Sequence, residues 1–381
     1  MAMSWLVYRL TNSAFALGII GFSSQISIFF VTPFAGVWAD QWNRQRIVIV
    51  TQILAMLQAF ILAFLVFTNT ATVWHVISLS IFLGLVNSFD MPVRQSFTVD
   101  MIENKEDLGN AIALNSLMFN IARFIGPTIA GILVAAFGEG MCFLLNGISY
   151  IAVIIALMSM KIIPQTKVCP NNHFWESMKE GFLYTFGFPP MRFILMLMGV
   201  VSLVVMPYAV LMPVFARDVL HGNAQTLGFL MGAAGLGALV GAIYLAAKKG
   251  VRGLDRTIAL STFILSAGLI VLSFSSELWL SLFLMAFIGF GIMVNTASSN
   301  TVLQTIVDDD KRGRVMSFYT MAFIGLSPFG SLLAGSLASV IGTPNTILIS
   351  GILCILGALV FVSKMKIFTK ILAIPAKINN L

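Results

Sequence analysis

The chain has 381 residues, of which 59% are hydrophobic and only 10% charged, and its mean hydropathy is +0.96. Soluble globular chains carry roughly 25% charged residues, because polar groups have to cover their surface. This composition excludes a soluble enzyme, a disordered chain and a nucleic-acid-binding module. Apolar runs of about 20 residues also exclude a membrane β-barrel, whose strands alternate apolar and polar residues. An all-α polytopic membrane protein remains.

Segments of about 20 mostly apolar residues, the length that crosses a bilayer, follow one another along most of the chain. Eleven are expected, at 16–39, 47–67, 73–95, 111–136, 141–160, 191–216, 226–247, 257–275, 278–302, 315–341 and 345–363. The long break after the fifth segment contains several charges and four prolines, and its SMKEGFLYTF stretch predicts a short amphipathic helix. The expected division is an N-terminal helical bundle over 1–160, a linker over 161–190, a C-terminal helical bundle over 191–365 and a tail over 366–381.

Lysine and arginine are unevenly distributed between the two sides of this arrangement. Of the 22 basic residues, all but four fall on the side of the linker. The four exceptions are Arg9 and Arg217 on the opposite side, and Arg94 and Arg123 within spans. Cytoplasmic loops are enriched in Lys and Arg, so we expect a bacterial inner (plasma) membrane protein whose linker and C-terminus are cytoplasmic. The net charge of +7 follows from this bias and indicates no nucleic-acid partner.

The two halves of the chain also repeat each other at an offset of 204–210 residues. The aligned pairs include Leu17-Gly18 with Leu227-Gly228, Arg46 with Arg256, Trp74 with Trp279, and Gly131 with Gly335. Parallel membrane repeats are typical of two-bundle transporters. The span at 191–216 has only MAMSWL as its counterpart, so the chain is expected to lack about 20 residues, most of a first helix.

Several motifs support a family resemblance. GVWADQWNRQR at 36–46 resembles the loop signature between the second and third helices of the major facilitator superfamily, and IGPTIAG at 125–131 resembles the Gly-Pro motif on the fifth helix of its proton-coupled exporters. FDMPVRQSFTVDMI and LGNAIALNSLMFNIARFIGPTIAG look like the branch of bacterial enterobactin-type siderophore and drug exporters. The resemblance covers nearly the whole chain. It implies the major facilitator fold, with two six-helix bundles of which the first is incomplete here.

The resemblance makes the loop at 36–46 a cytoplasmic gate. Gly36 allows two helices to approach closely, and the Asp40 carboxylate can meet the positive end of a helix in the other bundle, near Arg314. Arg44 and Arg46 can bind phosphates or pair with a carboxylate on helix 4. Three positions depart from the family pattern and weaken this interpretation: Gln41, Asn43 and Gln45. The alternative is ordinary positive charge on the cytoplasmic side.

Asp90 is the only acidic residue placed within a predicted span, and it shares a helix face with Asn87 and Arg94 at about 100° per residue. A charge inside the membrane is costly and suggests a function. Asp90 can take up a proton and couple its flux to that of a substrate. The alternative is a structural pair with Arg94, or a hinge at Pro92. We expect Asp90 about 7 Å from the cytoplasmic end of its helix, at about 1.5 Å per residue.

The predicted fifth helix carries Arg123 and the Gly126-Pro127 motif. We expect Gly126 and Gly131 to pack closely and Pro127 to remove one backbone hydrogen bond. Arg123 can bind an anionic substrate group or Asp90, and the alternative is a packing helix with a proline bend. Other buried polar groups are candidates for lining a cavity, although such groups usually join helices: Gln25, Asn115, Asn295 and Ser299.

The sequence contains no Walker loop, HExxH motif or GxSxG elbow. We therefore expect no enzyme activity, no catalytic residue, no nucleotide, no metal and no cofactor, with the proton gradient as the energy source. The expected partners are the lipid bilayer and a small-molecule substrate. The sequence favours proton-coupled efflux of a small amphipathic molecule, such as a siderophore, a drug or a related metabolite. A lysophospholipid or other lipid translocator, a non-transporting accessory of a secretion system, and an inactive fragment remain alternatives.

Overall fold

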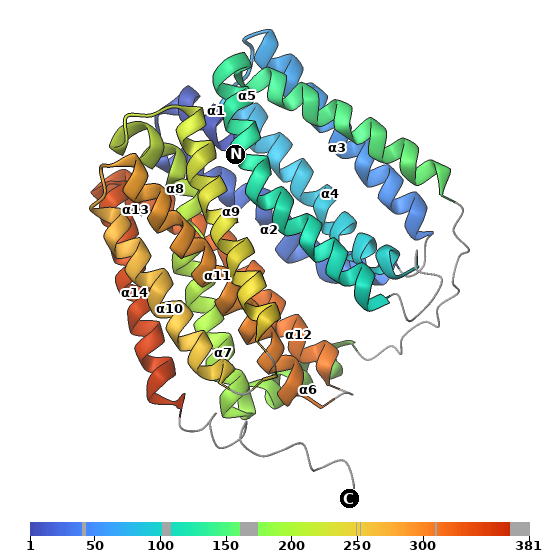
Figure 1. The fold of residues 1–381 in the computed structure, drawn as a ribbon. Coiled ribbons are helices and arrows are strands. Elements are labelled where there is room, and N and C mark those ends of the chain that lie inside the picture. The colour runs from blue at the N-terminus through green and yellow to red at the C-terminus, as the bar shows by residue number, and fades with distance from the viewer. Residues whose placement is uncertain are drawn as a thin grey trace, which may run out of the picture.

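The structure is a computed structural model, and it describes residues 1–39, 43–100, 108–160, 174–248, 250–251, 253–308 and 311–365. Every regular element within these residues is a helix. The helices form two groups that lie side by side and diverge toward one end of the molecule (Figure 1). All-helical architecture is what a chain of long apolar segments requires, because a helix satisfies its own backbone hydrogen bonds without water.

The first group, here called the N-terminal bundle, contains α1 (Ala2–Thr11), α2 (Ala14–Ala39), α3 (Arg44–Phe67), α4 (Val73–Asp100) and α5 (Leu108–Ser159). Gly138 within α5 has φ 79° and ψ 170°, outside the helical region, and the chain changes direction there (Figure 1). Glycine adopts such a conformation without a steric penalty. The spans predicted at 111–136 and 141–160 are therefore two helices joined at this glycine.

The second group, here called the C-terminal bundle, begins with one long span and continues with five more. The first span comprises α7 (Pro189–Val200), η2 (Val201–Val205), α8 (Tyr208–Val214) and η3 (Phe215–Val219), where η marks a π-helical turn. The next elements are α9 (Ala224–Ala247), α10 (Leu254–Ser273), α11 (Leu278–Ile306), α12 (Arg312–Thr320), η4 (Met321–Gly325), α13 (Ser327–Ile341) and α14 (Thr343–Ser363). In the described part of the chain 10 helices are long and apolar enough to cross a membrane, and one of these joins two predicted spans across Gly138.

The short helix expected in the linker is present as α6 (Phe174–Gly187). It packs on α12 of the C-terminal bundle, where Arg314 Nη1 lies 2.6 Å from Glu180 Oε2. Tyr184 donates a hydrogen bond to Asp308 at 2.9 Å. We call the end of the molecule that carries α6 the linker end, and the end that carries α1 and α8 the α1 end.

The two bundles meet at two glycine crossings. On α9, an ideal Cβ at Gly228 would lie 2.8 Å from Gly131 Cα on α5. On α13, an ideal Cβ at Gly335 would lie 2.6 Å from Gly18 Cα on α2. Contacts this short leave room only for glycine. The sequence repeat aligns Gly18 with Gly228 and Gly131 with Gly335, so each crossing joins one member of each aligned pair, and the two crossings are equivalent.

Candidate functional site

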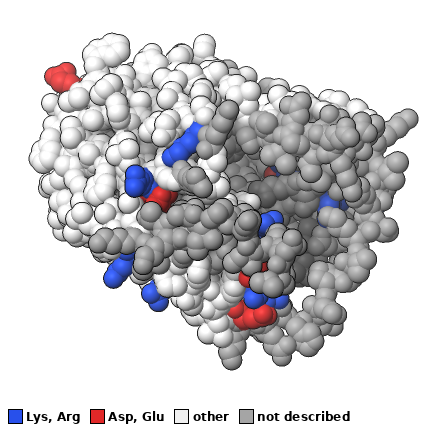
Figure 2. Space-filling model, turned by 60° about the horizontal axis from the view of Figure 1, so that its bottom comes forward, with Lys and Arg blue, Asp and Glu red and all other residues white. Residues whose placement is uncertain are grey.

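The apolar core shows which end of the space between the bundles is closed. One buried cluster joins both bundles toward the α1 end, and it includes Leu6, Leu17, Val205, Phe215 and Leu227. At the linker end the buried cores are separate: one lies wholly within the C-terminal bundle and the other wholly within the N-terminal bundle. The surface seen from the linker end is hollowed near its middle, and basic side chains reach the hollow (Figure 2). Among the described residues, the two bundles therefore share a buried core toward the α1 end and have separate cores at the linker end.

Polar contacts also close the α1 end. The Tyr8 hydroxyl on α1 donates a hydrogen bond to the Asp218 carboxylate on η3. Arg217 donates to Asn12 Oδ1 at 2.8 Å, and its guanidinium lies 5.7 Å from the centre of the Tyr8 ring. These contacts tie the N-terminal bundle to the C-terminal bundle beside the apolar cluster.

An ion pair at this end lies within the N-terminal bundle. Arg9 Nε is 2.8 Å from Glu139 Oε1, and the Glu139 side chain is only 7% exposed. Our sequence interpretation did not identify Glu139, Tyr8 or Asp218. A signal was present, because Arg9 and Arg217 are the only basic residues on a side that otherwise lacks positive charge, and such residues near apolar segments require partners.

The centre of the N-terminal bundle holds a buried carboxylate with a complete set of partners. Asp90 Oδ1 accepts hydrogen bonds from Thr51 Oγ1 at 2.7 Å and Gln52 Nε2 at 2.9 Å, both from α3. Asp90 Oδ2 lies 2.9 Å from Nε and 2.8 Å from Nη2 of Arg94. The Asp90 side chain is 11% exposed, whereas that of Arg94 is 48% exposed. The negative charge is thus enclosed between α3 and α4, and the guanidinium leads outward from it.

The pair lies deeper along its helix than the sequence predicts. We expected Asp90 about 7 Å from the end of the helix, but α4 continues through Pro92 to Asp100. The ten residues from Asp90 to Asp100 correspond to about 15 Å at about 1.5 Å per residue. Pro92 does not end the helix, because the elements around it supply the packing that an isolated helix would lack. A buried carboxylate is costly to desolvate unless it is paired.

The glycine motif on α5 is only partly as expected. Gly131 packs closely, as predicted, because it forms the crossing with Gly228. The prediction for Gly126 is wrong: an ideal Cβ there would meet no described atom within 4 Å. Pro127 lies inside α5 without ending it. Arg123 is exposed, and none of the described contacts joins it to Asp90.

The candidate cavity residues fall into two groups. Asn115 is exposed on α5 and Gln25 is half-buried on α2. Asn295 and Ser299 are both 0% exposed, which contradicts the expectation that they line a cavity. Asn295 Nδ2 on α11 donates to Thr262 Oγ1 on α10 at 2.7 Å, so this amide joins two helices of one bundle. Ser299 is equally buried, and the buried Ser299 Oγ and Asn295 Oδ1 have no hydrogen-bond partner among the described residues.

Of the predicted gate residues, Arg44 and Arg46 lie at the start of α3. Asp40 lies outside the described residues. Gly36 lies within α2, but the structure does not describe the contacts around it. Arg44 is the first residue of α3, and Arg46 is exposed. Asn43, which departs from the family pattern, caps the helix: its Oδ1 accepts from the Arg46 backbone N–H at 3.1 Å.

Comparison with known proteins identifies the family to which this chain belongs. Residues 1–375 match the family described as transmembrane secretion effector. The staphyloferrin A transporter of Staphylococcus aureus is 27% identical over 95% of this chain and 90% of its own length. The multidrug efflux pump Tap of Mycolicibacterium fortuitum is 24% identical over 91% and 87%. The enterobactin exporter EntS of Shigella boydii is 24% identical over 93% and 84%.

Solved transporter structures share the fold. A mutant form of the nucleoside transporter NupG superposes with a TM-score of 0.75 at 13% identity, covering 95% of this chain and 93% of that one. A bacterial homologue of the lysosomal transporter Spinster, in its inward-facing and occupied conformation, gives a TM-score of 0.68 at 14% identity over 97% and 93%. The family and the named relatives are membrane transporters and not enzymes. The chain belongs to the transmembrane secretion effector family of major facilitator transporters, in the branch of siderophore and drug exporters.

Proposed function

We propose that this protein exports a small amphipathic molecule, such as a siderophore, a drug or a related metabolite, in exchange for protons. The two bundles rock about the glycine crossings and expose a central site to each side of the membrane in turn. The observation that carries the proposal is the buried Asp90 carboxylate, which is held by Thr51, Gln52 and Arg94. The proton gradient supplies the energy, and no cofactor is needed.

The contacts of Asp90 support proton coupling. A carboxylate inside a membrane protein can hold or release a proton only if both states are accommodated. In the charged state the four contacts of Asp90 offset its desolvation. Protonation removes the charge that holds Arg94 in this pair, and the guanidinium can then bind an anionic group that enters the hollow.

The proposed orientation of the protein in the membrane follows from the distribution of Lys and Arg. With the linker end in the cytoplasm of a bacterial inner membrane, the described conformation is open to the cytoplasm and closed to the outside. This is the state in which an exporter loads its substrate. The relatives named for staphyloferrin A, enterobactin and multidrug efflux support this substrate class.

Proton movement in inside-out vesicles tests the proposal. We expect candidate siderophores or cationic dyes to cause the release of protons from vesicles with an imposed proton gradient, which a pH-sensitive dye reports. Asp90→Asn should reduce this proton release at least ten-fold. The substitution removes the titratable group and keeps the side chain's size. Glu277→Gln is the matched control, because Glu277 is an exposed carboxylate in the loop before α11.

Other outcomes of this experiment would contradict specific parts of the proposal. Release that survives Asp90→Asn would leave an exporter in which Asp90 is a structural partner of Arg94. No release with any substrate, from a folded and inserted protein, would favour a lipid translocator or an accessory of a secretion system.

The contact between Tyr8 and Asp218 makes a separate prediction about the closed end. A hydrogen bond to a charged group contributes about 1.5–3 kcal/mol, so Tyr8→Phe should raise the fraction of molecules open at the α1 end about ten-fold. Distances between spin labels at Thr70 and Ser276, which lie in exposed loops at this end, report that fraction. Tyr244→Phe is the control, because Tyr244 is exposed on α9. Unchanged label distances in Tyr8→Phe would show that the apolar cluster and the contact of Arg217 with Asn12 close this end without the Tyr8 hydrogen bond.

A further inference from the structure

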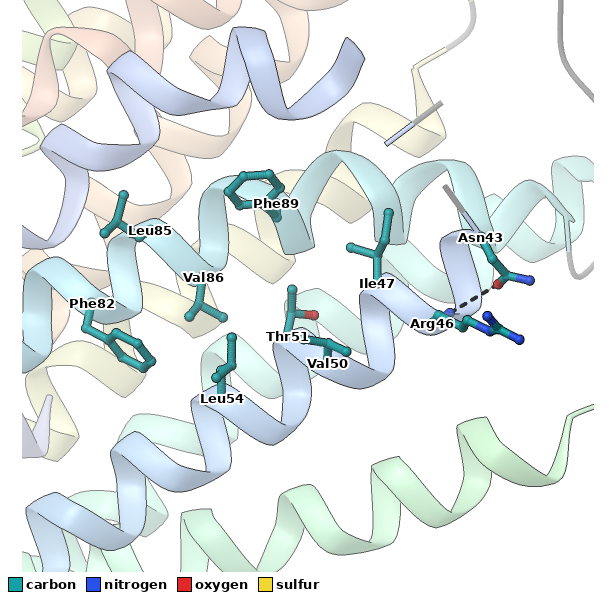
Figure 3. Close-up of a pocket in the computed structure, with 10 residues that line it drawn as sticks. All are labelled: Asn43, Arg46, Ile47, Val50, Thr51, Leu54, Phe82, Leu85, Val86 and Phe89. Carbon is teal, nitrogen blue, oxygen red and sulfur yellow. Dashed lines mark hydrogen bonds between the residues drawn. The ribbon is translucent and has the colours of Figure 1, made fainter. Parts of the chain in front are cut away.

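A groove of about 660 Å³ runs between α3 and α4 (Figure 3). Its walls are almost entirely apolar, and they comprise Ile47, Val50, Thr51, Leu54, Phe82, Leu85, Val86 and Phe89. The groove has one polar end, formed by Asn43 and Arg46 (Figure 3). Its volume falls within the range of about 300–1,000 Å³ that is usual for sites that bind small molecules.

The groove opens to the surroundings of the bundle and not to the transport path. At about 100° per residue, Phe82, Leu85 and Phe89 occupy a face of α4 roughly opposite to that of Asn87 and Arg94. Val50 on α3 is 53% exposed, and Leu85 on α4 is 41% exposed. In a membrane-spanning bundle, such a face is in contact with lipid.

The length of the groove matches one leaflet. It extends from Asn43, which precedes α3, to Leu54. The eleven steps from Asn43 to Leu54 rise about 16 Å at about 1.5 Å per residue. Half of the hydrocarbon core of a bilayer is about 15 Å. An acyl chain anchored at the membrane surface therefore reaches the far end of the groove, whereas a partner transmembrane helix would need a groove of about twice this length.

The polar end carries the charge that a lipid headgroup needs. Arg46 is exposed, and within the described part of the chain no carboxylate lies at ion-pair distance from its guanidinium. Arginine binds phosphate with two parallel hydrogen bonds. Its apolar stem also allows it to lie along the groove while its head stays at the membrane surface.

We propose that this groove binds an anionic glycerophospholipid from the leaflet at the linker end. One acyl chain lies between Val50 and Leu54 of α3 and Phe82 of α4, and the phosphate group lies on Arg46. The site is separate from the transport path, and the proposal does not depend on the transported substrate. Thr51 lines the groove and also donates a hydrogen bond to Asp90.

Native mass spectrometry of the purified, delipidated protein tests the proposal, with phosphatidylglycerol and phosphatidylcholine as probes. We expect one phosphatidylglycerol to bind in preference to phosphatidylcholine. Arg46→Gln should weaken that binding about five-fold, which corresponds to the roughly 1 kcal/mol that one basic residue contributes near an anionic membrane surface. Arg256→Gln is the matched control, because Arg256 is exposed, occupies the equivalent position in the sequence repeat and lies outside the groove.

A second pair of variants tests the acyl-chain part of the site. Val50→Trp fills the groove, whereas Leu57→Trp adds the same side chain to an exposed position of α3 outside it. We expect only Val50→Trp to remove the preferred lipid. Both positions are exposed, so neither variant disturbs the core. Equal loss in Arg46→Gln and Arg256→Gln would show general electrostatic attraction, and equal binding in the two tryptophan variants would show that the groove is not the site. Either result overturns the proposal, as does equal binding of the two lipids.

Discussion

We expect Gly228→Leu to abolish substrate movement while leaving the protein folded. A Cβ at Gly228 would lie 2.7 Å from the carbonyl oxygen of Pro127 and 2.8 Å from Gly131 Cα, and both are backbone atoms that cannot rotate away. Leucine at this position forces α5 and α9 apart. The closure at the α1 end cannot then form, and a transporter held open at one end cannot alternate.

The protein should still fold because the clash falls between the bundles and not within either one. The packing of α9 inside its own bundle uses other positions, such as Gly237, where an added Cβ would meet Ala286 on α11. Spin labels at Thr70 and Ser276 should move apart by several ångströms in Gly228→Leu, and transport should fall at least a hundred-fold. Ala246→Leu is the control, because it adds the same side chain to an exposed position of α9. Transport near the original rate in Gly228→Leu would mean that the crossing can open without loss of function.

The equivalent crossing gives an independent test of the same geometry. A Cβ at Gly335 would lie 2.6 Å from Gly18 Cα, so Gly335→Leu should separate α2 from α13 and stop transport as Gly228→Leu does. The two crossings join different pairs of helices, so each substitution acts on its own contact. A strong effect at one glycine and none at the other would contradict the equivalence that the repeat implies.

The glycine crossings show which part of the fold the sequence alone predicts and which part it does not. The repeat aligned Gly18 with Gly228 and Gly131 with Gly335, but an alignment relates positions and does not say which residues touch. The structure adds that the contacts run across the aligned pairs. Hydropathy placed the spans well because each apolar segment is long, and the break that it predicts between residues 136 and 141 contains the hinge at Gly138.

The errors have physical causes of the same kind. Gly126 was expected to pack because glycine in a membrane helix usually does, but whether a neighbour is present depends on the other helices. Asn295 and Ser299 are polar residues in an apolar segment, as cavity-lining residues often are. Only the position of α10 in the structure reveals that Asn295 joins two helices. The carboxylate of Asp218 lies in a short segment at the end of a span, so its contact with Tyr8, 210 residues away, has no local signature.

The ion pair at the centre of the N-terminal bundle should also carry much of that bundle's stability. Arg94→Met leaves the Asp90 carboxylate with its hydrogen bonds from Thr51 and Gln52 but without the guanidinium. Removing one partner of a buried polar group costs roughly 1–3 kcal/mol, and more for a charged group. Because Arg94 is 48% exposed, water replaces part of what is lost, and we expect a loss of about 2 kcal/mol in the free energy of unfolding.

A double-mutant cycle separates this contact from a general effect of the substitution. Thermal unfolding in detergent of Arg94→Met, Asp90→Asn and the double variant gives the coupling free energy between the two side chains. We expect the double variant to be more stable than Arg94→Met alone, because an amide in place of the carboxylate leaves no unpaired charge between α3 and α4. Arg94→Lys should recover part of the loss, since lysine restores the charge but cannot place two fixed N–H donors on Asp90 Oδ2 as Arg94 does. Additive effects in the cycle would mean that Asp90 is held by α3 alone, and Arg94 could then act on the substrate in both protonation states.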